Sequence, residues 1–411
     1  MSSGTPLHRV HAVEQEKPRS RARRIWHFVP LTVLMVIVLV LAIIGASTRI
    51  AMHEAAAQQQ RAVLAQPSQQ TSLPQSCTST GFPAHPKDIW TGARTADSEA
   101  KFAAHPDAQG MRVQGRDGFD FWGDAQSQNM SQALGRAPWL DSQLAQWLIY
   151  FDGLDRQLRK DGRDLVIVVA PAKWELYRDR LPEWTDGLQG RTHLEQFLEH
   201  SGDLPVVDVR DAMEKARQNA PVYSSVNSHW TPYGAYAAWR QTVACASVLY
   251  PESSWGKLAV PAVTGATISV APNEFSAFGD SSSPEDWATP TTAGQQTAVH
   301  STITGADGVE KAGPSDGSVG LLDLPARTAN PLGAGRALIL RDSTGEALAP
   351  SWAQAFQDTC QIRHNLDYSD KSANNTRPDV VAEAKKCGAD AVLYVFTERY
   401  FSQAPPSLPV E

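Results

Sequence analysis

The stretch that decides the fold is Leu165-Val166-Ile167-Val168-Val169, an apolar and mostly β-branched run with no polar residue inside it. A strand this apolar is buried on both faces, as parallel strands in α/β proteins are. The helical apolar spacing of residues 139–160 precedes the run, and Asp161-Gly162 breaks that helix. The run ends in the loop Ala170-Pro171-Ala172-Lys173. This order predicts one helix-strand unit of a parallel sheet.

The same alternation continues toward the C-terminus. Further buried strands are predicted at 204–209, 336–340 and 391–396, and helices at 192–200, 211–218, 233–249 and 347–356. Alternating strands and helices predict a three-layer α/β/α domain with a mostly parallel sheet, which we place at 81–411. Between 251 and 335 the composition shifts to Ser, Thr, Gly, Ala and Pro. We expect a loop-rich insertion on the same domain there, with a small separate β unit as the alternative.

The composition limits the partners. A net charge of -7 over 411 residues argues against nucleic acid, because that partner requires a basic face. The four cysteines lack metal-site spacing, so we expect no metal, and we expect no other cofactor. If the domain lies outside the cytoplasm, two disulfides can form. We expect Cys77 with Cys245 and Cys360 with Cys387, although sequence alone does not determine connectivity.

The N-terminal part indicates a membrane anchor. Residues 1–24 are polar and end in a basic cluster, and the run 28–46 contains no charge and is about long enough to cross a bilayer as a helix. We therefore predict a cytoplasmic tail at 1–24, a transmembrane anchor at 25–46 and a stalk at 47–80. The basic residues before the anchor keep the N-terminus in the cytoplasm. A cleaved signal peptide is the alternative, since Ala55-Ala56-Ala57 offers small residues.

Two polar side chains stand where such a fold exposes them. Ser343 follows the strand at 336–340, at the carboxyl edge of the sheet, and His229 precedes a helix that begins near Pro232. Serine with histidine is the minimum apparatus for acyl transfer. Each residue also has an ordinary structural interpretation: Ser343 as a helix cap, and His229 as a half-buried, hydrogen-bonded residue.

The segment Asn227-Ser228-His229-Trp230-Thr231, followed by LILRDS at 338–343, resembles a known family. The first is similar to the D-x-H-W-T segment, and the second to the G-D-S strand, of the SGNH hydrolase-like periplasmic O-acetyltransferases of the AlgJ/AlgX type. That family acetylates bacterial exopolysaccharides such as alginate. Further similar segments occur in the same order: GRDGFDFWGD (115–124), LVIVVAPAKWELYRDRLP (165–182), RPDVV (377–381) and FTERYF (396–401).

The resemblance implies roles for individual residues. Ser343 would carry the acetyl group, His229 would be its general base, and Asn227 would orient the imidazole. Lys173, Tyr177 and Arg399 fall on family-like positions and are candidate substrate contacts, as is Trp230, whose ring could stack on a sugar. Glu398 also falls on a family-like position. All four of Lys173, Tyr177, Glu398 and Arg399 can equally be structural, and for Glu398 and Arg399 we expect a surface or core ion pair.

Two departures from the family pattern bear on activity. Asn227 replaces the family's aspartate, and an amide can accept a hydrogen bond from imidazole without offsetting its charge. Arg341 replaces the glycine before the aspartate, where glycine would permit close backbone approach. From the residues alone, Asn227→Asp is expected to preserve or raise turnover.

Three functions are therefore weighed. The first is an O-acetyltransferase, anchored in a bacterial cytoplasmic membrane with its domain outside, that modifies a cell-surface polysaccharide. The resemblance implies that a multi-spanning membrane acyltransferase supplies the acetyl group. The second is an SGNH-type acetyl esterase. The third is a catalytically weakened relative that binds polysaccharide or acts as a scaffold.

Overall fold

The computed structural model describes residues 34–35, 37–41, 77–78, 84–293, 299–304, 308–364, 366 and 377–407. The chain divides into two compact units, 1–66 and 67–411. In the first unit, residues 34–35 and 37–41 are helical, and the predicted cytoplasmic tail at 1–24 lies outside the described residues, as do most of the anchor and the stalk. Within the described part of the chain, we find no helix with both the length and the apolar character needed to cross a membrane.

An eight-stranded sheet forms the centre of the second unit, in the order β4-β3-β12-β10-β11-β9-β7-β8. The first five strands in this order, β4 to β11, pair in parallel. Beyond β11 the sheet continues through β9, β7 and β8, and these pairings are antiparallel. The predicted α/β class with a mostly parallel central sheet is confirmed. The parallel strands are β3 (Asp164–Ala170), β4 (Val206–Val207), β10 (Arg336–Arg341), β11 (Asp358–Arg363) and β12 (Ala391–Thr397).

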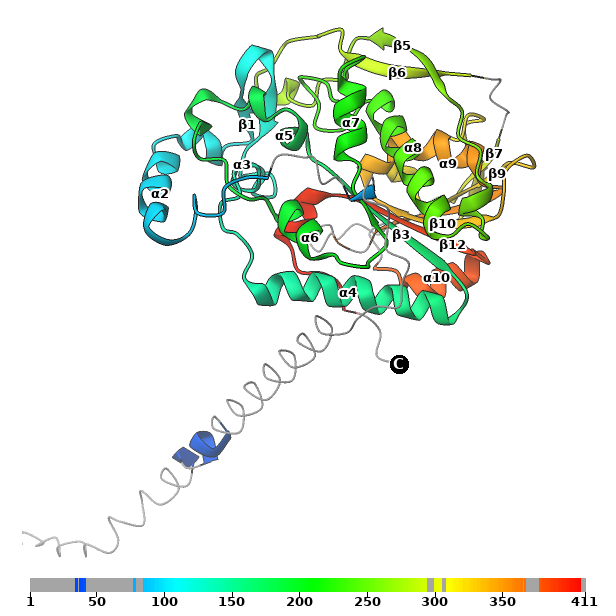
Figure 1. The fold of residues 1–411 in the computed structure, drawn as a ribbon, viewed down its shortest axis with the longest axis horizontal. Helices are drawn as coiled ribbons and strands as arrows, with labels where there is room; N and C mark the ends of the chain where they lie inside the picture. The colour runs from blue at the N-terminus through cyan, green and yellow to red at the C-terminus, as the bar shows by residue number, and fades with distance from the viewer. Residues whose placement is uncertain are drawn as a thin grey trace, which may run out of the picture. The chain divides into compact units, whose positions relative to one another are not determined.

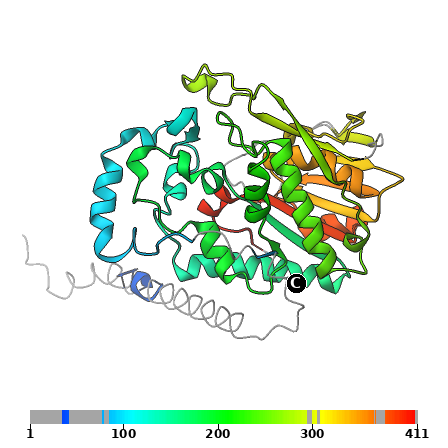
Figure 2. The ribbon, with the colours of Figure 1, turned by 45° about the horizontal axis from the view of Figure 1, so that its top comes forward.

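Helices cover both faces of the sheet (Figures 1 and 2). The bounds of the helices on one face are α7 (Arg210–Arg217), α8 (Pro232–Leu249) and α9 (Ala349–Ala355). Those on the other are α4 (Asp141–Lys160), α6 (His193–His200) and α10 (Val380–Cys387). Alternate residues of β3 pack into the two layers: Val166 and Val168 face α8, whereas Leu165 and Ile167 face α4. This alternation explains why the run 165–169 contains no polar residue.

A third apolar cluster lies N-terminal to these layers, around Trp90, Phe102 and Trp174. The elements in this region are α2 (Thr95–Ala103), β1 (Arg112–Gln114), β2 (Asp120–Trp122), α3 (Asn129–Ala133) and α5 (Lys173–Leu176). Because α5 follows β3 directly, this cluster lies beside the carboxyl edge of the sheet. It supplies one wall of the cleft described below.

The segment from 251 to 335 forms strands of two kinds. Three of them extend the central sheet: β7 (His300–Thr304), β8 (Glu310–Ala312) and β9 (Ala326–Ala329). The other two form a separate ribbon: β5 (Val263–Ser269) and β6 (Trp287–Thr292). The segment therefore belongs to the domain, because the central sheet runs through it.

The strand predicted at 204–209 is only two residues long. Pro205 has no N–H to donate to a neighbouring strand, and the Asp208 N–H donates to the Cys77 carbonyl at 3.1 Å instead. Two elements absent from the prediction, β11 and α10, complete the parallel part of the sheet and its second helix layer.

Both expected disulfides are confirmed. Cys77 is bonded to Cys245, which lies on α8, across 168 residues of sequence. Cys360 on β11 is bonded to Cys387 at the end of α10, across 27 residues. The first ties the start of the second unit to its main helix layer.

Candidate active site

Ser343 is presented by the turn that ends β10. The turn continues into a short 3-10 segment, η10 (Ser343–Leu348). Asp342 caps this segment, accepting from the Thr344 N–H at 2.8 Å, and its other oxygen accepts from the Thr397 N–H at 2.9 Å. Asp342 is 1% exposed, so both bonds are shielded from water. The serine is therefore held at the carboxyl edge of the sheet, between β10 and β12.

His229 is held by the segment that leads into α8. Thr231 caps this helix, accepting from the Gly234 N–H at 3.1 Å, and Pro232 occupies its first turn. Trp230 is fully buried, and its Nε1 donates to the Thr344 carbonyl at 2.7 Å. This bond joins the histidine segment directly to the serine turn.

The two side chains meet. His229 Nε2 lies 2.8 Å from Ser343 Oγ, a hydrogen-bond distance between residues 114 positions apart. On the other side of the ring, Nδ1 contacts Glu274 Oε1 and lies 3.1 Å from Asn227 Oδ1. Because one ring nitrogen faces a hydroxyl and the other faces a carboxylate, Ser343, His229 and Glu274 have the geometry of a Ser-His-acid triad.

Glu274 is the functional candidate that the sequence prediction missed. It lies in the loop between β5 and β6, and its Oε2 accepts from the Ser228 N–H at 3.0 Å. Burial raises its pKa, but the hydrogen bond and charge of His229 outweigh burial and lower the pKa to about 2. Burial in turn lowers the pKa of His229, and its hydrogen bond to Glu274 raises it above the ordinary value. No local pattern around Asn273-Glu274-Phe275 distinguishes this acid from the others in the insertion.

Asn227 contacts the same histidine in a different way. Its Oδ1 accepts from the His229 backbone N–H at 2.9 Å, and its Nδ2 donates to the Pro272 carbonyl at 2.7 Å. The amide thus links the histidine turn to the loop that carries Glu274. The charge beside the imidazole comes from Glu274, and Asn227 holds the backbone around it.

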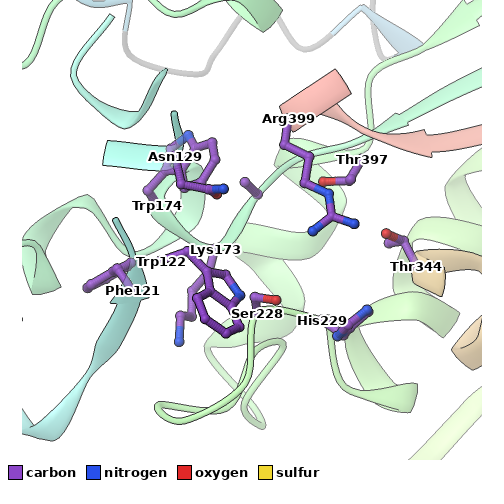
Figure 3. A pocket seen from close by; sticks show the side chains of 11 residues that line it. Phe121, Trp122, Asn129, Lys173, Trp174, Ser228, His229, Thr344, Thr397 and Arg399 are labelled. Carbon is purple, nitrogen blue, oxygen red and sulfur yellow. The ribbon is translucent and has the colours of Figure 1, made fainter. Parts of the chain in front are cut away.

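A cleft with about 420 Å³ of empty space opens beside His229 (Figure 3). Its wall combines aromatic rings from the N-terminal cluster with polar side chains from the sheet edge. The lining residues are Phe121, Trp122, Asn129, Ala172, Lys173, Trp174, Ser228, His229, Thr344, Thr397 and Arg399. Within the described residues, no group of three or more His, Cys, Asp or Glu side chains is arranged to hold a metal ion.

Lys173 lines this cleft and is 2% exposed. Its Nζ donates to the Ser224 carbonyl at 3.2 Å and to the Ser225 carbonyl at 2.8 Å, and it lies 5.1 Å from the centre of the Phe121 ring. Burial lowers the pKa of this amine to about 7. Lys173 therefore fastens the backbone just before His229.

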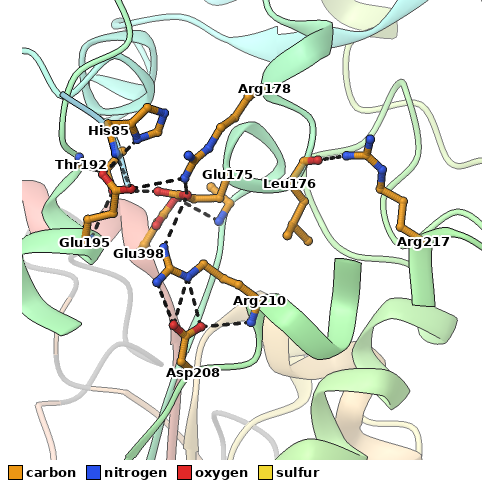
Figure 4. A network of polar contacts seen from close by, with 11 residues as sticks. His85, Glu175, Leu176, Arg178, Thr192, Glu195, Asp208, Arg210, Arg217 and Glu398 are labelled. Atoms are coloured by element: carbon orange, nitrogen blue, oxygen red, sulfur yellow. Dashed lines mark hydrogen bonds and ion pairs between the residues drawn. The ribbon is translucent and has the colours of Figure 1, made fainter. Parts of the chain in front are cut away.

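Arg399 and Glu398 point in different directions. Arg399 lines the cleft, and Figure 3 shows its guanidinium extending into the space above His229. Glu398 is 3% exposed and accepts from the Ala172 N–H at 3.0 Å. Burial and the nearby charge of Glu175 raise the pKa of Glu398 well above its usual range. Figure 4 shows Glu398 beside a network of acids and arginines that includes Glu175 and Arg210.

Arg341 lies away from the cleft. It is fully buried, its Nη2 donates to the Val319 carbonyl at 2.6 Å, and its Nε donates to Gln361 Oε1 at 3.2 Å. Burial lowers its pKa to about 10. The absence of a Cβ on Gly345 makes room for the arginine stem, since a Cβ there would lie 2.5 Å from Arg341 Cδ.

Two predicted substrate contacts are not in the cleft. Trp230 is buried against the serine turn, as described above, so its ring cannot stack on a sugar. Tyr177 is 7% exposed and packs against Phe119, with ring centres 5.0 Å apart, and against Arg217. For both residues, the aromatic surface is used in packing, and neither lines the cleft. Lys173 and Arg399 remain as lining residues.

Comparison with known proteins bears on the fold and family. Residues 127–267 match the family model described as SGNH hydrolase-like domain, acetyltransferase AlgX. This confirms the AlgJ/AlgX-type resemblance. No curated protein matches the sequence.

Several solved structures are similar to the chain. Bacillus cereus PatB1 with a sulfonyl adduct is 17% identical, covers 64% of this chain and 90% of its own, and has a TM-score of 0.48. The O-acetyltransferase domain of Pseudomonas putida AlgJ is 16% identical, with coverage of 72% and 94% and a TM-score of 0.39. Pseudomonas aeruginosa AlgX is 13% identical, with coverage of 71% and 63% and a TM-score of 0.33. At TM-scores below 0.5, these likenesses carry no weight for the function.

Proposed function

We propose that this chain is an O-acetyltransferase that acetylates a polysaccharide through Ser343, since residues 127–267 match the family model described as SGNH hydrolase-like domain, acetyltransferase AlgX. The single observation that carries the proposal is the 2.8 Å contact between His229 Nε2 and Ser343 Oγ, beside an open cleft. Nucleophile and base are already within the distance that proton transfer requires.

The reaction has two halves. In the first, Ser343 Oγ attacks the acetyl carbonyl of the donor while its proton passes to His229 Nε2. The leaving group then takes that proton, and the acetyl group stays on the serine as an ester. In the second half, a sugar hydroxyl gives its proton to His229 and attacks the acetyl ester. Ser343 Oγ leaves with the proton, so both residues return to their starting states.

The surrounding charges support both halves. Glu274 stabilises the imidazolium that forms whenever His229 holds the extra proton. Arg399 places a positive charge in the cleft, where the carbonyl oxygen becomes an oxyanion. The Thr344 N–H is bonded to Asp342 and is therefore not the amide that stabilises this oxyanion.

Glu274 also bears on the hypothesis of a catalytically weakened relative. The weakened-relative hypothesis depended on Asn227 standing where the family has an acid. Since Glu274 supplies a carboxylate to the same ring nitrogen, that departure no longer argues against catalysis. The proposal includes the membrane anchor at 25–46, a domain outside the bacterial cytoplasmic membrane, and a multi-spanning acyltransferase as acetyl donor. The two disulfides support an oxidising compartment.

A serine-reactive fluorophosphonate probe tests the nucleophile. We expect labelling of the wild type and of Ser247→Ala, a control on α8 away from the cleft, and none of Ser343→Ala. Mass spectrometry after incubation with p-nitrophenyl acetate and an oligosaccharide then separates transfer from hydrolysis. Undiminished labelling of Ser343→Ala would remove the basis of the proposal, and acetate release without acetylated sugar would indicate an esterase.

A further inference from the structure

A second groove lies next to the catalytic cleft and has about 660 Å³ of empty space. Residues of α3 and of the 3-10 segment η11 (Glu398–Ser402) line both the cleft and the groove. From α3, Asn129 lines the cleft whereas Ser131 lines the groove; from η11, Arg399 lines the cleft whereas Ser402 lines the groove. We propose that this groove binds an uncharged stretch of the polysaccharide, beside the sugar that is acetylated. The inference rests on the proposed function and adds a binding site and a substrate class to it.

The lining of the groove is rich in amides. Glutamine supplies five of its fifteen lining residues: Gln128, Gln132, Gln143, Gln146 and Gln403. A glutamine amide offers both donors and acceptors, which matches the hydroxyl and acetamido groups of sugars.

The charge in the groove does not favour a polyanion, because the positive side chain that lines it is already paired with a carboxylate. Among the described residues that line it, Arg136 is the one lysine or arginine. It is bonded to both carboxylate oxygens of Glu99, with Nη2 2.8 Å from Oε2 and Nε 3.0 Å from Oε1. The whole chain has a net charge of -7, which repels an acidic polymer at long range. Both features favour a neutral glycan.

An aromatic platform forms part of the wall. Trp139 is half-buried, stacks on His193 with ring centres 4.6 Å apart and planes 9° apart, and donates from Nε1 to the Phe401 carbonyl at 3.2 Å. These contacts hold the ring in one orientation, so a sugar that packs on its accessible part loses little additional side-chain entropy.

His193 adds an unused acceptor. Its Nε2 bonds the Ala137 carbonyl at 3.1 Å, and because a carbonyl only accepts, Nε2 carries the proton of the neutral ring. Nδ1 is therefore an acceptor, and it is buried without a partner among the described residues. Such a group is costly when left unsatisfied, and a ligand hydroxyl is the donor it lacks.

Residues with an unfavourable backbone conformation lie at the same groove. In the described residues, four non-glycine positions have positive φ. Two of them line this groove, Gln128 (54°) and Ala137 (61°), and a third, Ser127 (53°), directly precedes Gln128. Such conformations persist only where the surroundings enforce them, and they concentrate at functional sites. Gln132 Nε2 provides that support, donating to the Ser127 carbonyl at 2.6 Å and to the Arg399 carbonyl at 3.2 Å. One side chain therefore joins the groove to the segment that carries Arg399.

Calorimetric titration of the full-length protein with maltohexaose, chitohexaose and a hexamer of mannuronate tests the proposal. We expect at least one neutral hexamer to bind, and to bind more tightly than the uronate. Trp139→Ala should weaken that binding at least tenfold. Gln146→Ala, at an exposed helix position that tolerates alanine, should weaken it about threefold. Gln218→Ala, at an exposed position next to α7, is the matched control and should bind as the wild type does.

Hydrolysis of p-nitrophenyl acetate separates the groove from the chemistry, because this ester needs no sugar. We expect both groove variants to hydrolyse it within twofold of the wild-type rate. Titrations with the Ser343→Ala protein measure sugar binding even if acetyl transfer by this chain fails. Binding of neither neutral hexamer, tighter binding of the uronate, or unchanged affinity in both groove variants would overturn the proposal.

Discussion

Replacing Glu274 by glutamine removes one charge from the site and keeps the size of the side chain. Its amide can still contact His229 Nδ1 and Ser228 N–H, so the loop should keep its position. What is lost is the anion that would stabilise the imidazolium during both halves of the proposed reaction. We therefore expect a fall in turnover with an unchanged fold.

The pKa of Glu274 sets the magnitude. Its fall from 4.5 to about 2 occurs despite burial and corresponds to about 3 kcal/mol in favour of the charged carboxylate, at about 1.4 kcal/mol per pKa unit. His229 is the largest source of that stabilisation. If most of this stabilisation acts on the imidazolium-like transition state, its loss lowers kcat by about 10²-fold. The glutamine amide can also favour the wrong histidine tautomer. That would bring the loss toward the roughly 10⁴-fold seen for an Asp-to-Asn change in a serine protease.

The assay is the pH dependence of p-nitrophenyl acetate turnover. His229 must be neutral to accept the serine proton, and its pKa is raised, so wild-type kcat/KM should rise with pH through an inflection above 6.5. In Glu274→Gln the inflection should move to lower pH, because the hydrogen bond that raises the pKa is weakened while burial still lowers it. Glu285→Gln, an exposed acid of the same insertion, is the control. Turnover within threefold of wild type, with an unmoved inflection, would refute the role of Glu274.

Three further outcomes follow from the structure. Asn227→Asp sets a second carboxylate beside Glu274 and removes the donor to the Pro272 carbonyl, so kcat/KM should fall about tenfold; preserved turnover would support the expectation from the sequence instead. The pKa of Lys173 is about 7 in the folded protein and 10.5 in the unfolded chain, so between these pH values the folded protein binds fewer protons at this residue than the unfolded chain does. The free energy of unfolding of wild type relative to Lys173→Met, measured by urea titration, should therefore rise by up to about 1.4 kcal/mol per pH unit across that range. Replacing Cys77 and Cys245 together by alanine should cost about 3–5 kcal/mol of unfolding free energy, since that disulfide closes a loop of 168 residues; a loss below 1 kcal/mol would contradict the estimate.

Local sequence patterns were sufficient to predict the strands and helices that form the layers of the fold. The run at 165–169 is apolar throughout because both of its faces are buried, and Thr231-Pro232 starts α8 through contacts within one helical turn. Local patterns failed to predict an element whose buried residues are polar. The strand β11 reads as polar, yet its Gln361 and Arg363 are buried, and Gln361 accepts from Arg341. A polar residue whose partner lies on another strand cannot be distinguished from a surface residue by sequence spacing.

The sequence by itself determined that a serine and a histidine stand at the ends of elements that an α/β sheet presents at one edge. Only the tertiary structure decided that they meet, and that the acid beside them is Glu274. Phe275 is fully buried against Trp122, with ring centres 4.6 Å apart, and the Glu274 N–H donates to the Val226 carbonyl at 3.1 Å. These long-range contacts position the loop, and an irregular loop has no periodicity from which its place could be predicted.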